Sequence, residues 1–186
     1  MPDDSLILKL ASADLSARES AAAEIFARGR ALAAPIAPAW LQDSDLHANF
    51  NAGNPRMTVG FAVFPETFGK IRAANGNSRL AVVPPDQDAI EFELHFAGGA
   101  QIDILTTKAP GGPGAIARFL EKFGEGIQQV EFDVESVDDA TEILRSRFNL
   151  APLYPATRSG ADGTRVNFFL VSRPDGRKVL IELVEK

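Results

Sequence analysis

The stretch GIQQVEFDV, residues 126–134, decides the fold, because it predicts a buried strand that leads directly into a helix starting at Ser136. An earlier stretch, TVGFAV at residues 58–63, has the same form and is also followed by a helical pattern. Each is followed by a second apolar strand that contains one acidic residue, at residues 102–105 and at residues 181–184. From about residue 56 onward, the sequence therefore predicts one structural unit that occurs twice.

Both predicted units have the element order βαβββ. The first module, residues 56–109, is expected to contain a strand at 58–63, a helix from Pro65 to about Gly76, strands at 80–83, 90–96 and 101–106, and a hairpin tip at Gly98-Gly99. The second module, residues 115–186, is expected to contain a leading helix at 115–123, a strand at 127–134, a helix at 137–148 capped by Ser136, and strands near Tyr154, at 166–171 and at 179–184. Two such modules side by side can curl their sheets into an open barrel with a central cleft, which is an α+β fold.

The N-terminal residues 1–55 are predicted to form a helical extension followed by a linker, the linker being the polar and turn-rich residues 43–55. Ser16 followed by Glu19 matches a capping box, Gly29 is a weak point or a break in the helical pattern, and Pro35 precedes a second short helix. This pattern resembles a single repeat of the HEAT type. Because one such repeat cannot bury its own apolar face, we expect it to pack on the main domain or on a second subunit.

The bulk composition excludes several classes of protein. The chain has 186 residues, of which 45% are hydrophobic, and this is enough for one sizeable core with an appendage. No apolar run is long enough to span a membrane, and the acidic N-terminus is unlike a secretory signal. The chain has no cysteine, and its net charge of −6 argues against nucleic acid as a partner. We therefore expect a cytoplasmic protein that neither spans a membrane nor binds nucleic acid.

The paired modules resemble the vicinal oxygen chelate (VOC)/glyoxalase superfamily and, within it, the methylmalonyl-CoA epimerases. The similarity covers roughly residues 56 to 186, about two-thirds of the chain. It is carried by four stretches: Pro85-Asp86-Gln87, residues 116–126, residues 163–168 and residues 179–183. The resemblance implies a barrel of paired βαβββ modules whose central cleft holds the active site, and it implies a homodimer, for which the helical extension is a natural contact.

In that superfamily, four side chains hold a divalent metal in the cleft: two His, one Gln or Glu, and one Glu. The matching positions here are Thr58, Asp103, Gln129 and Glu182, so both imidazoles are replaced. The remaining donors are oxygen atoms, and they suit a hard cation such as Mg²⁺ or Mn²⁺ better than a transition metal that prefers imidazole. The cofactor is accordingly expected to be a divalent metal (Mg, Mn or Co), or there is none.

The resemblance also implies a pair of carboxyl groups that move a proton next to a carbonyl group, and these match Glu91 and Glu182. Asp103 and Glu182 lie inside apolar strands, where an ionised group is costly unless it is paired or ligated. Thr58, Asn167 and Arg165 are candidates for contacts with the substrate, Arg165 because a guanidinium suits an anionic group.

Strand alternation offers a rescue of the metal site. If Glu91 faces the cleft, Glu93 and His95 do so too, and His95, Asp103 and Glu182 could form a site of one His and two carboxylates. A three-residue tip at Gly98-Gly99-Ala100 would place His95 opposite Asp103. A two-residue tip would instead place Leu94 there, and His95 could then not complete the site.

The sequence thus predicts a VOC enzyme of the isomerase, epimerase or lyase type that acts on a small acid or an acyl thioester. The alternative is a metal-free protein that binds a small molecule without catalysis, as resistance-type members of the superfamily do. The two retained carboxylates favour catalysis, and the missing imidazole pair favours binding. A dioxygenase is poorly supported because it needs two His ligands in the cleft.

Overall fold

A computed structural model describes residues 4–50 and 56–186 of the chain. The chain divides into two units, which we call unit 1 (Met1–Gly29 and Thr58–Gln128) and unit 2 (Arg30–Met57 and Gln129–Lys186). Each unit thus combines part of the N-terminal helical region with one of the predicted modules. None of the helices in the described part of the chain is long and apolar enough to cross a membrane.

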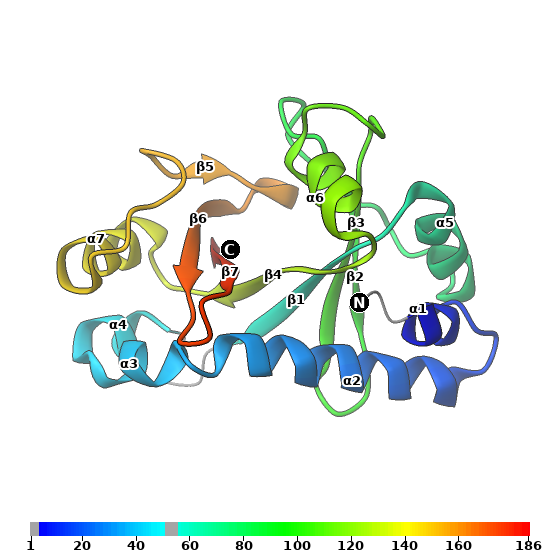
Figure 1. The fold of residues 1–186 in the computed structure, drawn as a ribbon, viewed down its shortest axis with the longest axis horizontal. Helices are drawn as coiled ribbons and strands as arrows, with labels where there is room; N and C mark the ends of the chain where they lie inside the picture. Colours follow the sequence, from blue (N-terminus) through cyan, green and yellow to red (C-terminus); the bar gives the residue numbers. More distant parts are fainter. Residues whose placement is uncertain (1–3, 51–55) are drawn as a thin grey trace. The chain divides into compact units, whose positions relative to one another are not determined.

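Unit 1 is built around three strands in the order β2-β3-β1, with β1 parallel to β3 and β2 antiparallel to β3 (Figure 1). Its elements are α1 (Asp4–Leu10), most of α2 (Leu15–Ala33), β1 (Met57–Ala62), α5 (Pro65–Ala74), β2 (Ile90–His95), β3 (Gln101–Thr106) and α6 (Ala115–Phe123). Pro65 begins α5, where its missing N–H leaves no hydrogen bond unmade. The helix packs through Phe68 against Phe92 of β2, with the ring centroids 4.8 Å apart.

Helices cover both faces of this small sheet. On the face of Phe92, α2 approaches β1 so closely that a Cβ atom on Gly29 would lie 2.3 Å from a methyl carbon of Val59. This explains why a glycine stands at position 29, although α2 runs unbroken through it where the sequence had indicated a weak point or a break. On the other face, Leu120 of α6 packs against Leu105 of β3 in a small apolar cluster.

The predicted strand at residues 80–83 is wrong. This segment has no regular strand, although the backbone N–H of Ala81 donates to the carbonyl oxygen of Glu91 at 3.0 Å. Its apolar side chains are not buried as a strand would require, and Val82 is 71% exposed. Because Pro84 and Pro85 follow immediately, they limit further pairing with β2. The segment is therefore a loop along the edge of the sheet.

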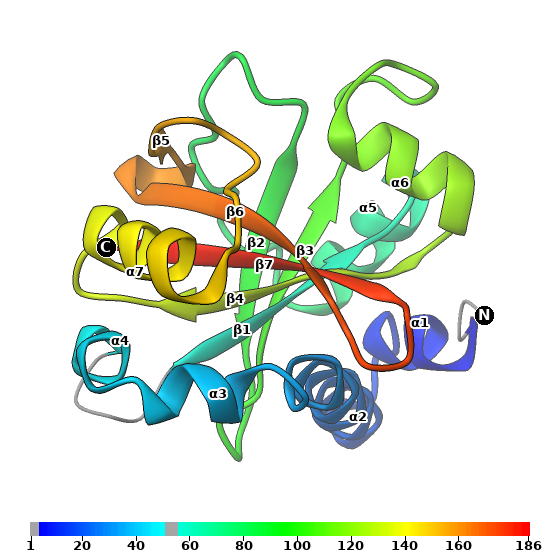
Figure 2. The ribbon, with the colours of Figure 1, turned by 60° about the vertical axis from the view of Figure 1, so that its left-hand side comes forward.

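Unit 2 has four strands in the order β4-β7-β6-β5, with β4 parallel to β7 and the other neighbours antiparallel (Figure 1, Figure 2). Its elements are α3 (Ala37–Gln42), α4 (Ser44–Asn49), β4 (Gly126–Asp133), α7 (Val137–Phe148), β5 (Arg158–Ser159), a 3₁₀ turn (Ala161–Gly163), β6 (Arg165–Ser172) and β7 (Lys178–Glu185). As predicted, the Ser136 hydroxyl caps α7 by accepting from the backbone N–H of Asp139. The α+β class with two repeated modules is confirmed.

The core of unit 2 lies between one face of its sheet and the helices α3, α4 and α7. Phe132 of β4 is central to it, with the rings of Trp40 at 6.4 Å and of Phe50 at 5.9 Å, both edge-on. The apolar face of α3 and α4 is thus buried against the second module of the same chain. The predicted linker ran from residue 43 to residue 55, but α4 occupies residues 44–49, and residues 51–55 lie outside the described residues.

Candidate functional site

Three of the predicted site residues of unit 1 share one face of its sheet. Along β2, the half-buried Glu91 and the exposed His95 alternate with the buried Phe92 and Leu94, as a strand requires. Asp103 of β3 is half-buried on the same face, next to Gly60 of β1. Because Leu105 on this face packs beneath α6, the helix covers one end of the face. Glu91 is the register partner of Leu105, and Asp103 lies two residues before Leu105 on β3.

Thr58 of β1 also belongs to this face, since it lies two residues before Gly60 on the same strand. Its side chain is buried. The four positions of unit 1 that the sequence singled out, Thr58, Glu91, His95 and Asp103, are therefore brought to one side of the sheet by strand register.

The predicted pairing of His95 with Asp103 is wrong. The hairpin closes where the N–H of Phe96 donates to the carbonyl oxygen of Ala100 at 3.0 Å, so its tip is residues 97–99. This register places Glu93 opposite Asp103 and His95 opposite Gln101. The His95 ring lies 3.2 Å from the Gln101 amide and 3.3 Å from the Glu93 carboxylate, and its side chain is 61% exposed.

In unit 2, a cluster of three polar side chains lies on the face of the sheet opposite the helices. The Gln129 amide nitrogen donates to Glu182 Oε2 at 2.5 Å and to Glu131 Oε1 at 3.0 Å. Glu131 on β4 is also the register partner of Glu182 on β7. Gln129 is 7% exposed and Glu182 is 9% exposed, so a carboxylate and the amide that holds it are both buried.

Glu131 was missed by the sequence reasoning. It lies two residues after Gln129, so strand alternation alone places both side chains on one face. That signal was present in the stretch GIQQVEFDV, but the pairing of Glu131 with Glu182 depends on the register between β4 and β7.

Asn167, a predicted substrate contact, lies on the other face of the sheet. Its register partner is Leu183, whereas Glu182 is opposite Phe168. The Asn167 side chain is almost fully buried beneath α7, where its amide nitrogen lies 3.4 Å from the Thr141 hydroxyl. The structure therefore does not bring Asn167 and Glu182 together, and Asn167 is part of the packing between β6 and α7.

Arg165 is on the Asn167 face as well, and its partners are structural. Its guanidinium bonds Asp138 at the start of α7 and Glu185 on β7, the latter at 2.9 Å. The backbone N–H of Val137 and then Arg165 hold the pKa of the Glu185 carboxyl below its ordinary value. Hydrogen bonds from the Thr157 hydroxyl and then from Arg165 likewise hold the pKa of the Asp138 carboxyl below its ordinary value. This network joins the first turn of α7 to the strands, and it occupies the guanidinium predicted to bind substrate.

The residues of each unit, taken by itself, do not fit a divalent metal. No three His, Cys, Asp or Glu side chains within residues 4–50 and 56–186 lie together in a way that could hold one. Gln129 presents its amide nitrogen to the two carboxylates, and a nitrogen that donates two hydrogen bonds is not a ligand. No step proposed below passes through a metal.

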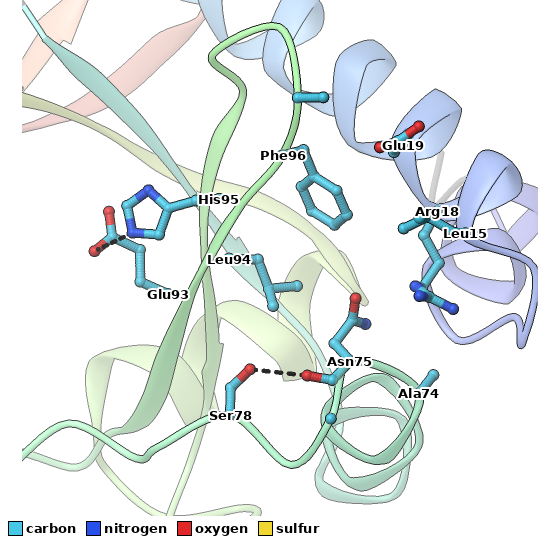
Figure 3. A pocket seen from close by; sticks show the side chains of 12 residues that line it. Leu15, Arg18, Glu19, Ala74, Asn75, Ser78, Glu93, Leu94, His95 and Phe96 are labelled. Atoms are coloured by element: carbon cyan, nitrogen blue, oxygen red, sulfur yellow. Dashed lines mark hydrogen bonds and ion pairs between the residues drawn. The ribbon is translucent and has the colours of Figure 1, made fainter.

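A separate cavity of about 410 Å³ lies in unit 1, between α2, the end of α5 and the end of β2 (Figure 3). Phe96 and Leu94 form an apolar wall, and Arg18 lies across from them on α2. Glu93 and His95 also line the cavity, although their side chains point to the side of β2 opposite Phe96 (Figure 3).

Solved structures similar to this chain include methylmalonyl-CoA epimerases. The enzyme of Mycobacterium tuberculosis is 31% identical with a TM-score of 0.56, over 72% of this chain and 87% of that chain. A variant of the Streptomyces coelicolor epimerase, in complex with 2-nitronate-propionyl-CoA, is 25% identical with a TM-score of 0.54, over 69% of this chain and 94% of that chain. A hypothetical protein from Bacillus halodurans C-125, with 24% identity and a TM-score of 0.55 over 69% of this chain and 91% of that chain, shares the fold.

A scan of the sequence against protein-family models finds no match, and neither does a search of curated proteins.

Proposed function

Because the chain belongs to the vicinal oxygen chelate superfamily, we propose that it is an isomerase of the epimerase type, which removes and returns a proton on the carbon next to a carbonyl group. The proposed substrates are acyl thioesters of coenzyme A. Two facts support this substrate class: two of the three solved structures named above are methylmalonyl-CoA epimerases, and one of these is in complex with 2-nitronate-propionyl-CoA.

The observation that carries the proposal is the buried carboxylate of Glu182, held by the Gln129 amide at 2.5 Å. A carboxyl group removed from water is suited to accept or donate a proton on carbon, because little solvent competes for its charge. Its hydrogen bond to Gln129 fixes one carboxylate oxygen, and this limits the positions from which the other can reach a substrate.

The proposed reaction conserves all atoms and electrons. A carboxylate removes the α-hydrogen as a proton, and the electrons of the C–H bond move toward the carbonyl oxygen to form an enolate. A proton then returns to the same carbon from the opposite side, and the configuration at that carbon is inverted. We assign one proton transfer to Glu182, and the proton that returns from the opposite side must come from a second acid.

The test is the exchange of the α-hydrogen of methylmalonyl-CoA for deuterium in D₂O, followed by proton NMR. Wild-type protein is expected to catalyse exchange and to equilibrate the two epimers. Glu182→Gln is expected to slow equilibration by about 10²-fold or more, the usual contribution of a general acid or base. Binding of the thioester in a calorimeter without any exchange would contradict the proposal, and it would favour a protein that binds its ligand without catalysis.

A further inference from the structure

Glu131 and Glu182 hold the Gln129 amide between them. The amide has two N–H donors at one end and an acceptor oxygen at the other, whereas an ionised carboxylate only accepts. The Gln129 nitrogen uses one N–H for Glu131 and one for Glu182. If the amide turned by half a rotation, its oxygen would face two carboxylates and both hydrogen bonds would be lost.

Glu131 therefore acts on the orientation of Gln129 and not on the substrate. With Glu182 alone, an amide that turned would lose one hydrogen bond. With Glu131 on the same strand face, it would lose two. The buried position of Gln129 removes water as a replacement partner.

We propose that Glu131 is a positioning residue that keeps the Gln129 amide turned as a donor to Glu182, so that this amide holds the carboxylate in the place of a metal ion. A glutamine that binds a metal must present its oxygen, and the orientation enforced by Glu131 is the opposite one. The catalytic part of this inference rests on the proposed function, whereas the orientation of the amide does not.

The orientation is tested by NMR on ¹⁵N-labelled full-length protein. The Gln129 side-chain NH₂ signals are assigned by their absence in Gln129→Ala. In the wild type they are expected to exchange slowly with solvent and to stay sharp when one equivalent of Mn²⁺ is added. Glu131→Ala is expected to speed their exchange by about tenfold, because one of the two bonds is removed. Glu131→Gln, whose amide oxygen can still accept, is expected to retain slow exchange.

The catalytic consequence is tested with methylmalonyl-CoA and the same variants. Glu131→Ala is expected to lower kcat about tenfold with KM unchanged, and Glu131→Gln is expected to stay within about threefold of the wild type. Glu135→Gln, an exposed acid just beyond the end of the same strand, is the matched control and leaves both kcat and the NH₂ signals unchanged. All variants are compared by circular dichroism so that unfolding is recognised.

Three outcomes separate the inference from the proposed function. Broadening of the wild-type Gln129 signals by one equivalent of Mn²⁺ would overturn the inference, because it would place a metal beside the amide. The inference would also be overturned if the wild type is active and Glu131→Ala has the same NH₂ exchange rate and the same kcat as the wild type. In that case the proposed function would stand. Slow NH₂ exchange that depends on Glu131, in a protein without activity, would support the orientation while the proposed function fails.

Discussion

Replacing Gly29 by alanine tests how tightly α2 packs on β1 in unit 1. A Cβ atom at this position would lie 2.3 Å from one methyl carbon of Val59 and 3.0 Å from the other, and Val59 is fully buried. Alanine favours a helix interior over glycine by about 1 kcal/mol. Overpacking a buried contact costs about 1–3 kcal/mol. The net expectation for Gly29→Ala is therefore a free energy of unfolding between about 0 and 2 kcal/mol lower than in the wild type.

Gly69 provides a matched control within the same unit. It lies inside α5, and a Cβ atom there would meet nothing within 4 Å. Gly69→Ala should therefore show only the higher helix propensity of alanine and raise the free energy of unfolding by about 1 kcal/mol. The difference between the two variants isolates the contact with Val59, and it should be about 1–3 kcal/mol.

The assay is urea unfolding followed by far-ultraviolet circular dichroism, with Gly29→Ala also placed in a Val59→Ala background. There the methyl groups that clash are gone, so adding alanine at Gly29 should stabilise the protein, and the two substitutions should not be additive. Equal stability of Gly29→Ala and Gly69→Ala would refute the reasoning, since it would mean that α2 does not approach β1 as described.

Three further predictions concern unit 2. Phe132→Ala should lower the free energy of unfolding by about 3–5 kcal/mol, because the Phe132 ring lies between two aromatic side chains. The measurement is urea unfolding followed by tryptophan fluorescence, and a decrease below about 1 kcal/mol would contradict the packing. The backbone N–H of Leu46 and then Arg147 hold the pKa of Asp43 below its ordinary value of 3.8, so Asp43 stabilises the fold at neutral pH and the benefit is lost as the pH falls through its lowered pKa. Asp43→Asn should accordingly lower Tm at pH 7 and converge with the wild type in acid, and a gap that stays constant with pH would oppose this. Arg165→Gln should lower Tm through the network on α7 but leave KM for methylmalonyl-CoA unchanged, whereas a large rise in KM would restore its predicted role in substrate binding.

The repeated modules could be predicted from sequence because their patterns are local. Apolar strands followed by helices occur twice. Pro65 begins the first helix and Ser136 caps the second, and neither signal requires anything distant in the chain. The segment at residues 80–83 shows the limit of such patterns. It has the apolar residues of a strand, but a strand also needs a partner along its length, and two prolines prevent it.

The candidate site was less accessible because it depends on register. A shift of one residue at the tip of the hairpin decides whether His95, Leu94 or Glu93 faces Asp103, and the glycines there permit several tips. Asn167 was likewise assigned without knowing its partner on β7, and the observed pairing with Leu183 places it on the helical face. Gln129 and Glu182 were predicted as site residues from the resemblance, but the hydrogen bonds that the Gln129 amide donates to Glu182 and to Glu131 appear only in three dimensions.

The most direct test of the proposed chemistry compares two substitutions on β7. Glu182 lies on the face with Gln129, whereas Glu185 lies on the helical face, where it bonds Arg165 and the start of α7. In D₂O with methylmalonyl-CoA, Glu182→Gln should reduce the rate of exchange of the α-hydrogen by about 10²-fold or more, and Glu185→Gln should leave it close to that of the wild type. Equal exchange rates in the two variants would contradict the assignment of proton transfer to Glu182.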